Sequence, residues 1–379
     1  MNSIISLGLY QNSGGPTKTI GYFQRALDAK VYAFCKAKEI MKYPLAVEHS
    51  CPVRSFDLPI LSQFCVPPKE ECHEAELALA KSNILSVHSF YRYHALWVNR
   101  MSNRYGVPYW FVPHGILDPW VMKKAAFAKK IFWEAGGRKF LDQASTVICS
   151  TTRERDKAMR QFELPAADVI HWPVKVPDCS EREARRNELR RHLGVPDSAR
   201  VLLYFGRLHS MKRPLETIRA VAAVRSERLH LVIVGNDQDV TLKDCYNLAV
   251  KLGVERRVHL VGPVYGKAKY DYMFASDGYI SMSNRENFNH TAAESMSAGL
   301  PLILSPGNDL FSDIEPVNCA WGLVDDQIVT ATRVIECFAN KSQVELLEMG
   351  RRGSHWVMSN LSFSTFQTRL QRVVEKYSK

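Results

Sequence analysis

Several features that would quickly assign a chain to a class of proteins are missing from this sequence of 379 residues. It has no run of about 18 consecutive apolar residues, which excludes a membrane-spanning helix of ordinary length. Residues 1–10 lack the basic segment and the small-residue cleavage site of a signal peptide, so we expect a cytoplasmic protein. No repeat of fixed period and no low-complexity tract is present, so a repeat array is excluded as well.

The usual signatures of disulfides, metals and nicotinamide cofactors are also missing. The nine cysteines are odd in number, scattered and without a Cys-x-x-Cys pair, which predicts reduced thiols. Cys72-His73 has no second pair at the spacing of metal ligands. No Gly-x-Gly-x-x-Gly motif with an acidic residue after the next strand occurs. We therefore expect neither a metal ion nor a cofactor.

The overall composition is that of a globular protein with an excess of basic residues. Hydrophobic residues make up 46% and charged residues 23% of the chain, whose length suits two domains of about 150 residues each. Lysine and arginine number 50 against 39 acidic residues, a net charge of +11. Such an excess favours anionic partners, namely nucleotide phosphates, nucleic acid or an acidic membrane.

Short apolar runs alternate with helical patterns along the chain, which predicts an α/β protein with parallel sheets. Most of these runs are continuous, as expected of strands that are buried on both faces. The strands predicted for the first half span residues 4–10, 31–35, 84–88, 108–112, 146–149 and 169–172. Those of the second half span residues 201–205, 229–234, 258–261, 279–282, 302–305 and 320–324.

A proline-bounded segment predicts the division into domains. Pro173 and Pro177 follow the last strand of the first half, and a charged helical run at 181–191 opens the second half. We therefore expect domains at 1–177 and 178–359. The tail over 363–377 has helical apolar spacing and could pack on either domain; we expect the helix, within 360–379, to return to the first.

The strongest motif runs from Ser283 to Glu294, between an apolar strand and a helix that ends at Gly299. Asn289 is a plausible N-cap, and Gly299 stands where a helix favours a left-handed residue. Glu286 then lies in the loop after the strand and Glu294 in the first turns of the helix, where doubly wound sheets bind ligands. The two carboxylates suit sugar hydroxyls. The alternative is a capping box that only satisfies helix N–H groups.

A second motif covers residues 205–214, where cations follow a buried strand. Arg207 and Lys212 would stand at the strand's carboxyl end, and Pro214 suits the first turn of a helix. A guanidinium and an ammonium there can neutralise a diphosphate. The alternative is an ordinary basic surface loop.

Two weaker motifs lie in the first half. Gly14 and Gly15 stand between a strand and a helical stretch, where the backbone can approach a phosphate closely; a plain turn would look similar. His114, in Val112–Trp120, follows another strand, and a lone histidine is more often structural than catalytic.

In this order the motifs resemble those of the GT-B glycosyltransferases of family GT4, a large group of retaining enzymes that use nucleotide-sugar donors. The resemblance spans nearly the whole chain and is strongest over residues 201–305. There Arg207 with Lys212, and the Glu-x7-Glu pair of Glu286 and Glu294, fall on the family pattern.

In the first half, Gly14-Gly15 and His114-Gly115 match the glycine turn and the acceptor-domain histidine of the family. The resemblance implies two Rossmann-like domains that face each other across a cleft, the first binding the acceptor and the second the donor. His114 would lie near the transferring carbon.

The resemblance also assigns roles in donor binding. Arg207 and Lys212 would hold the donor diphosphate in place of a metal ion, Glu294 would accept from the ribose hydroxyls, and Glu286 would contact the transferred sugar. Backbone groups around Gly262 and Val264 would receive the base. N–H groups of the glycine turn and of the second motif would complete the site, the latter from Asn287, Phe288, Asn289, His290 and Thr291.

The sequence departs from the family at one place. The common forms are Glu-Gly-Phe-Gly and Glu-Asn-Phe-Gly, whereas this chain has asparagine at position 289. Asparagine tolerates a positive φ better than most residues, so we expect the loop to keep its shape. The added side chain puts the choice of donor in doubt; we favour a UDP-sugar, with GDP-mannose second.

Residues 120–140 mix aromatic and apolar residues with cations, which suits a helix at the anionic inner face of the cell membrane, where a lipid-linked acceptor would lie. The alternative is an amphipathic helix packed on the sheet. The cations are Lys123, Lys124, Lys129, Lys130, Arg138 and Lys139.

Other functions fit parts of the sequence. A nucleic-acid-binding protein would explain the charge, but the cations stand at strand ends and no RNA-binding aromatic signature occurs, so we expect no nucleic acid. A nucleotide-sugar 2-epimerase of the same fold needs no acceptor, and a phosphorylase needs a pyridoxal-binding lysine that we cannot identify.

Overall fold

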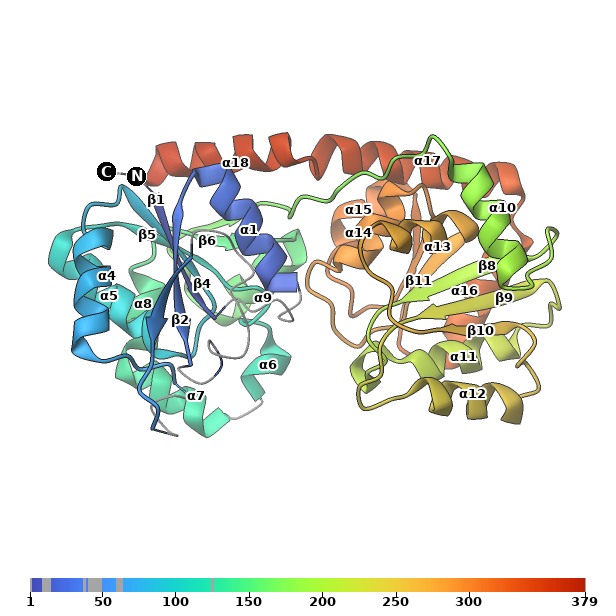
Figure 1. The fold of residues 1–379 in the computed structure, drawn as a ribbon, viewed down its shortest axis with the longest axis horizontal. Helices are drawn as coiled ribbons and strands as arrows, with labels where there is room; N and C mark the ends of the chain where they lie inside the picture. Colours follow the sequence, from blue (N-terminus) through green and yellow to red (C-terminus); the bar gives the residue numbers. More distant parts are fainter. Residues whose placement is uncertain are drawn as a thin grey trace. The chain divides into compact units, whose positions relative to one another are not determined.

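The structure, a computed structural model, describes residues 2–8, 15–36, 39, 50–58, 64–123 and 126–378. The chain forms two compact units (Figure 1). Unit 1 comprises residues 1–173 and 363–379, and unit 2 comprises residues 174–362. In the described parts of the chain, no helix is both long and apolar enough to cross a membrane.

Unit 1 is built on a parallel sheet with the strand order β3-β2-β1-β4-β5-β6-β7. Its strands are β1 (Asn2–Leu7), β2 (Lys30–Cys35), β3 (Ser50–Arg54), β4 (Ile84–His88), β5 (Tyr109–Val112), β6 (Val147–Cys149) and β7 (Ala167–Val169). Its helices are α1 (Gly15–Leu27), α4 (Lys69–Leu79), α5 (Tyr93–Tyr105), α6 (Pro119–Lys123), α7 (Ala126–Phe132), the π-helical η1 (Trp133–Gly137), α8 (Arg138–Asp142), α9 (Thr152–Gln161) and α18 (Phe363–Tyr377).

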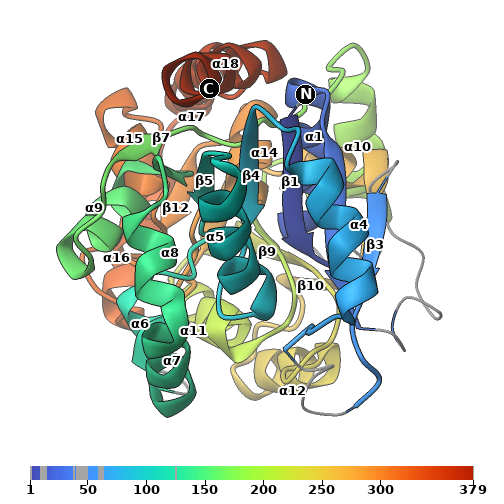
Figure 2. The same cartoon turned by 90° about the vertical axis from the view of Figure 1, so that its left-hand side faces the viewer.

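Helices cover both faces of this sheet (Figure 2). Alternate strand residues point to opposite faces, so Ile5 joins a core with α5 and α8 while its neighbour Ile4 faces the other side. On that other side, Phe23 of α1 packs against Phe366 of the C-terminal helix α18, with ring centroids 5.1 Å apart. The apolar stripe of the chain's last helix is therefore buried on unit 1.

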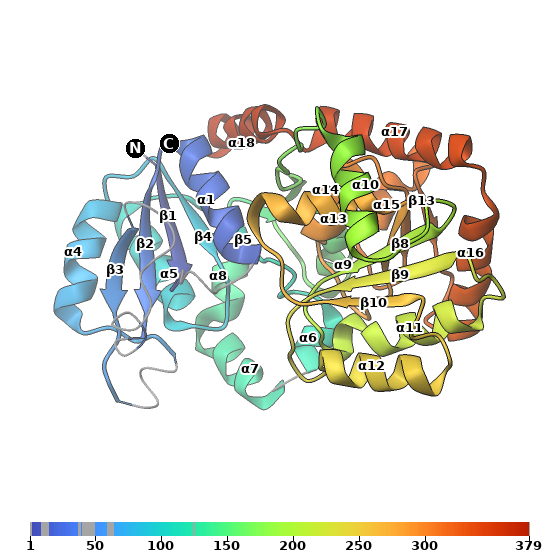
Figure 3. The same ribbon diagram turned by 45° about the vertical axis from the view of Figure 1, so that its right-hand side comes forward.

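Unit 2 has a second parallel sheet, with the strand order β10-β9-β8-β11-β12-β13. Helices lie on both faces, with α10, α13 and α14 on one and α11 and α12 on the other (Figure 3). The strands are β8 (Arg200–Phe205), β9 (Leu229–Val234), β10 (Val258–Val261), β11 (Gly278–Ser281), β12 (Leu302–Leu304) and β13 (Ala320–Gly322). The helices are α10 (Arg182–His192), η2 (Ser210–Lys212), α11 (Pro214–Ala223), α12 (Leu242–Lys251), η3 (Gly266–Ala268), α13 (Lys269–Ala275), α14 (His290–Ser297), α15 (Phe311–Ile314), η4 (Glu315–Val317), α16 (Ile328–Asn340) and α17 (Gln343–Asn360).

Two strands differ most from the sequence-based expectation. The strand expected at residues 169–172 lies instead at Ala167–Val169, because its partner β6 ends at Cys149 and offers no further pairing. Strand β3 was not predicted, since Pro52 interrupts a short and partly polar run. It is tolerated because β3 is the edge strand, where a missing N–H costs no ladder bond.

Histidines in both units have pKa values that burial lowers. In unit 2, His230 of β9 stacks on His259 of β10 with ring centroids 5.2 Å apart, and Nδ1 of His230 lies 2.9 Å from Nε2 of His259. Burial, with a contribution from His259, lowers the pKa of His230 to about 4, and burial also lowers the pKa of His259. In unit 1, burial lowers the pKa of His94 to about 4.

We therefore expect the free energy of unfolding to fall as the pH drops from about 6.5 toward 4. In this window the unfolded chain binds protons that the folded histidines reject, so protonation favours unfolding. Urea unfolding near pH 7 and near pH 5 measures the effect. A variant with His230→Gln and His259→Gln should lose less stability between the two pH values. The exposed His192→Gln should behave as the parent does, and equal losses in all three proteins would contradict the prediction.

Candidate active site

Three loops of unit 2 meet at the carboxyl edge of its sheet, after β8, β11 and β12. The N–H of Asn284 donates to the carbonyl of Met211, at 2.9 Å, which joins the first loop to the second. Glu286 forms a two-way link to the third loop: its N–H donates to Gly307 O at 2.8 Å, and its carbonyl accepts from Asp309 N–H at 2.9 Å. Main-chain hydrogen bonds therefore fix the loops that carry the predicted residues.

Two glycines that the sequence analysis did not single out make this close approach possible. A Cβ atom at Gly307 would lie 2.3 Å from the carbonyl oxygen of Asn284. A Cβ atom at Gly235, after β9, would lie 1.9 Å from the carbonyl oxygen of Gly206. Gly235 directly follows β9, and Gly307 follows the first loop residues after β12. This position after a strand is the feature of the sequence that could have indicated both glycines.

The structure brings Lys212 and Glu286 together. The ammonium of Lys212 donates to Oε1 of Glu286, which also accepts from the Ser283 hydroxyl at 2.9 Å. The side chains of Lys212 and Glu286 are only 21% and 13% exposed. Within the described residues, the second oxygen of Glu286, Oε2, accepts no hydrogen bond. This oxygen remains able to accept from a ligand hydroxyl.

Arg207 lies on the same edge, directly after Gly206. Its main-chain carbonyl accepts from the buried hydroxyl of Tyr204 at 2.9 Å, whereas its side chain is exposed. Within the described residues, the guanidinium of Arg207 makes no hydrogen bond or ion pair. The following Pro214 opens α11, as the sequence predicted. Three cations, Arg207, Lys212 and Arg213, thus lie on the segment between β8 and α11.

Asn289 has the left-handed conformation that its residue type led us to expect, with φ of 50°. It caps α14, because its side-chain oxygen accepts from the N–H of Ala292 at 3.1 Å. Its amide group donates to Oδ1 of the fully buried Asn308 at 2.6 Å. Gly299, at the end of the helix, also has a positive φ, of 80°. Asparagine at position 289 therefore adopts a positive φ, as a glycine readily would.

Glu294 lies on the second turn of α14 and has a partner that the sequence analysis missed. Its Oε1 lies 2.5 Å from Nζ of Lys269, the first residue of α13, and both side chains are mostly buried. On the same helix start, Phe288 and His290 pack edge to face with centroids 5.1 Å apart, and Thr291 is half-buried. A lysine 25 positions away in sequence gave no motif that could have revealed the pair.

The remaining expected residues of unit 2 form the loop after β10. Gly262 and Val264 are half-buried, and a Cβ atom at Gly262 would meet nothing within 4 Å. Asn287, in the loop after β11, is also half-buried. These three residues are therefore partly exposed.

In unit 1, the predicted residues lie at the carboxyl edge of the other sheet. Gly15 begins α1, whereas Gly14 lies outside the described residues. His114 follows β5 with φ of 51°, and Nε2 of its ring lies 2.9 Å from Nδ1 of His88. The buried carboxylate of Glu154 accepts from Gly115 N–H at 2.6 Å and thereby fixes this turn. Neither His88 nor Glu154 was predicted to take part.

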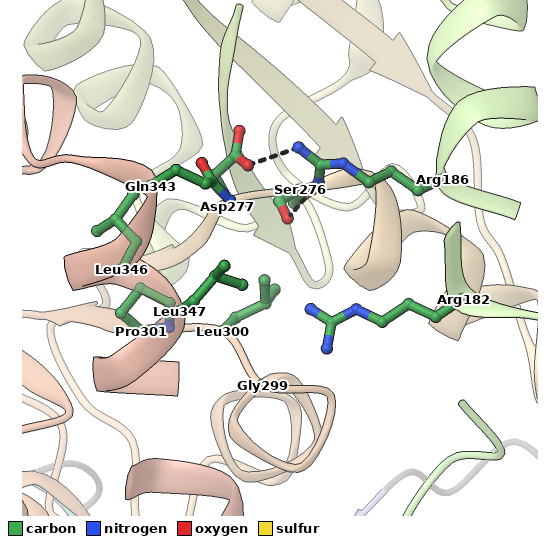
Figure 4. A pocket seen from close by; sticks show the side chains of 10 residues that line it. All are labelled: Arg182, Arg186, Ser276, Asp277, Gly299, Leu300, Pro301, Gln343, Leu346 and Leu347. Carbon is green, nitrogen blue, oxygen red and sulfur yellow. Dashed lines mark hydrogen bonds and ion pairs between the residues drawn. The ribbon is translucent and has the colours of Figure 1, made fainter. Parts of the chain in front are cut away.

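A cavity of about 90 Å³ in unit 2 lies at the opposite, amino edge of the sheet and is separate from this site (Figure 4). Arg186 on its wall already donates to the carboxylate of Asp277, at 2.7 Å, and to two main-chain carbonyls. Asp277 precedes β11 and Pro301 precedes β12, which places the cavity away from the loops described above.

The two parallel-sheet units, together with the solved structures to which the chain is similar, identify the GT-B fold of glycosyltransferases. The chain is similar to Anabaena Alr3699/HepE solved in complex with UDP-glucose, with a TM-score of 0.75, 15% identity and 99% of each chain covered. It is also similar to sucrose-phosphate synthase from Thermosynechococcus elongatus, with a TM-score of 0.74, 15% identity, and 99% and 98% of the two chains covered.

Family models assign the chain to a family within this fold class. The model described as glycosyl transferases group 1 matches residues 185–315, and the glycosyl transferase 4-like domain matches residues 14–174. The chain therefore belongs to the group 1 glycosyltransferases, family GT4. Both the family and the fold class expected from the sequence are confirmed.

Curated relatives share part of this sequence. A D-inositol 3-phosphate glycosyltransferase of Streptomyces avermitilis is 27% identical over 235 residues, 57% of this chain and 49% of that protein. The enzyme of the same name from Kineococcus radiotolerans is 27% identical over 264 residues, 65% of this chain and 59% of that protein. The chain spans about half the length of the curated relatives it matches.

The geometry at Asn289 predicts how strongly different substitutions there destabilise the protein. Asn289→Ala should lower the free energy of unfolding by about 2–4 kcal/mol, because the N-cap is lost, Asn308 stays buried with one partner fewer, and alanine resists a positive φ. Asn289→Gly should cost less, since glycine accepts that φ. Urea unfolding measures both. The exposed Asn318, with φ of 54°, is the control, and Asn318→Ala should cost less than Asn289→Ala.

Proposed function

We propose that this protein is a retaining glycosyltransferase that moves a sugar from a nucleotide-sugar to a saccharide or a lipid-linked saccharide in glycoconjugate biosynthesis. One observation carries the proposal: Lys212 and Glu286 form an ion pair at the carboxyl edge of the unit 2 sheet, and Arg207 lies on the same loop as Lys212. It combines positive charge for a diphosphate with a carboxylate oxygen for a sugar hydroxyl.

The cations act on the leaving group. Cleavage of the sugar–phosphate bond increases the negative charge on the departing phosphate while the sugar ring becomes oxocarbenium-like. Arg207 and Lys212 bind this charge more strongly in the transition state than in the ground state, which lowers the barrier. Under this proposal they take the place of a metal ion, and no cofactor is needed.

The carboxylates bind hydroxyl groups of the donor. Oε2 of Glu286 accepts from the transferred sugar while Oε1 stays with Lys212 and Ser283. Glu294 accepts from the ribose and shares its charge with Lys269. Main-chain groups at Gly262 and Val264 receive the base.

Further N–H groups complete the donor site under this proposal. They come from residues 287–291 of unit 2. The helix N-terminus at His290 adds a favourable dipole for an anion.

Retention of configuration follows from attack on the face that the phosphate leaves. The departing phosphate accepts the proton of the acceptor hydroxyl, so that no protein carboxylate has to form a covalent intermediate. A UDP-sugar is the first donor to test, a choice supported by the UDP-glucose bound in the similar HepE structure, and GDP-mannose is the second.

Removal of either cation should nearly abolish transfer while the fold survives. Lys212→Ala and Arg207→Ala should each lower kcat by about 10²–10³-fold, the usual result of deleting one donor to a developing anion. Calorimetric titration with UDP and GDP should show weaker binding in both variants. Lys243→Ala, at an exposed lysine of α12, is the control and should match the parent.

Retained turnover in Lys212→Ala would contradict the phosphate role, and loss of activity in EDTA would contradict the metal-free mechanism. An isomerised donor sugar formed without any acceptor would indicate the 2-epimerase instead.

We also propose that α6 and α7 contact an anionic membrane surface. The side chains of Phe127 and Ile131 are 79% and 55% exposed although they lie one turn apart, and Trp120 is 45% exposed. The exposed Lys130 lies between the first two. Lys129 instead bonds to the carbonyl of Val121, and Lys124 lies outside the described residues.

Vesicle sedimentation tests this surface. The parent should sediment with anionic vesicles and not with neutral ones, and Phe127→Glu should sediment less, because it adds a negative charge to an apolar face. Val344→Glu, at a 73% exposed position of unit 2, should leave binding unchanged. Equal sedimentation of the parent with both kinds of vesicle would remove the membrane contact.

A further inference from the structure

A row of hydrogen bonds runs beneath His114 in unit 1. Nε1 of Trp110 lies 2.5 Å from Oγ of Ser86, which lies 2.9 Å from Nε2 of His88. Nδ1 of His88 lies 2.9 Å from Nε2 of His114. Trp110, Ser86 and His88 are at most 1% exposed, so water does not compete for these bonds.

Strand geometry explains why these side chains meet. Ser86 and His88 are two residues apart on β4 and share one face, and Trp110 of β5 stands opposite Ser86 in the parallel register. Phe23 of α1 covers the row, with its ring edge to face against His88 at 4.8 Å. The row is therefore held rigidly.

Trp110, at one end of the row, determines which atom donates in each of the hydrogen bonds. The indole of Trp110 can only donate, so Ser86 Oγ accepts from it. Within the described residues, Ser86 Oγ has one other partner, His88 Nε2, which must accept if the buried serine proton is to be bonded. Burial, aided by His114 and His94, lowers the pKa of His88 well below its usual value, which favours the neutral ring. The single proton of His88 then lies on Nδ1.

We propose that Ser86 and His88 are positioning residues that hold neutral His114 with its proton on Nδ1. Nδ1–H of His88 donates to Nε2 of His114, so this nitrogen is occupied as an acceptor. The remaining nitrogen of His114 is then a hydrogen-bond donor and not a base.

This assignment deepens the proposed function, because it rests on His114 serving the transfer reaction. A donor nitrogen suits an oxygen acceptor on the substrate, such as a sugar hydroxyl or a phosphate oxygen. It does not suit removal of the acceptor's proton, which the leaving phosphate takes in the proposed mechanism. The row therefore makes His114 a hydrogen-bond donor to the substrate and not a general base.

Nitrogen NMR of the full chain labelled with 15N-histidine tests the tautomer directly. Near pH 8, the parent should show a pyrrole-type Nδ1 and a pyridine-type Nε2 for His114, whose signals are assigned by their loss in His114→Gln. A pyridine-type Nδ1 in the parent would overturn the proposal.

Two variants of His88 distinguish its role as a hydrogen-bond donor from its role in packing. His88→Phe keeps a ring against Phe23 but removes the donor, so His114 should populate both tautomers. The kcat should fall by about 10- to 100-fold, as when outer hydrogen-bond partners of histidines at metal sites are removed. His88→Asn keeps an N–H group at the place of Nδ1 and should restore the parent tautomer and much of the rate.

Ser86→Ala replaces His88→Phe in the test if His88→Phe does not fold. In Ser86→Ala, too, His114 should populate both tautomers. Ser82→Ala is the matched control, because Ser82 is a buried serine of the same unit that bonds to Ser3 at 2.9 Å and not to this row. An unchanged His114 tautomer in both His88→Phe and Ser86→Ala would overturn the proposal. A changed tautomer with full transfer activity would support the row and contradict the role of His114 in transfer.

Discussion

The hydrogen bonds that join Glu286 to the loop after β12 determine where the charges of the candidate site lie. Glu286 both donates to and accepts from that loop through its main chain, and Gly307 leaves the space for it. Its side chain is consequently held within reach of Lys212, which comes from the loop after β8. Main-chain hydrogen bonds thus join the three loops to one another, and electrostatic stabilisation of a transition state requires such fixed positions.

The ion pair at this edge also explains how a lysine can be kept mostly buried without a ligand. An unpaired ammonium in this place would carry a large desolvation cost, and Glu286 offsets that cost while leaving one oxygen available. Lys269 and Glu294 repeat the arrangement on neighbouring helices of the same unit. Both predicted carboxylates are therefore paired with a cation, so that neither leaves uncompensated negative charge in unit 2.

Local patterns in the sequence predicted most of the fold and the shape of the loops. Continuous apolar runs marked the buried strands, and the residue types at Asn289 and Gly299 correctly indicated left-handed conformations. These features depend on near neighbours in the chain. Strand β3 escaped prediction because a proline is acceptable only at an edge, and the strand order that makes it an edge is not a local property.

Contacts between distant segments could not be predicted in the same way. The pair of Lys269 with Glu294, and the bond of His88 to His114, depend on which strands and helices become neighbours. The motif at His114 was visible, yet its chemical role depends on Ser86 and Trp110, which belong to ordinary buried strands.

The two units use the edges of their sheets in different chemical ways. In unit 2, charged side chains on loops are paired across the edge, which suits recognition of a charged leaving group. In unit 1, the row beneath His114 is neutral and buried, and a charged His88 would be strongly disfavoured there. A neutral row transmits orientation from Trp110 to His114 without adding charge. The same parallel-sheet framework therefore provides electrostatic binding in one unit and a directed hydrogen bond in the other, because the residues that follow and line the strands differ.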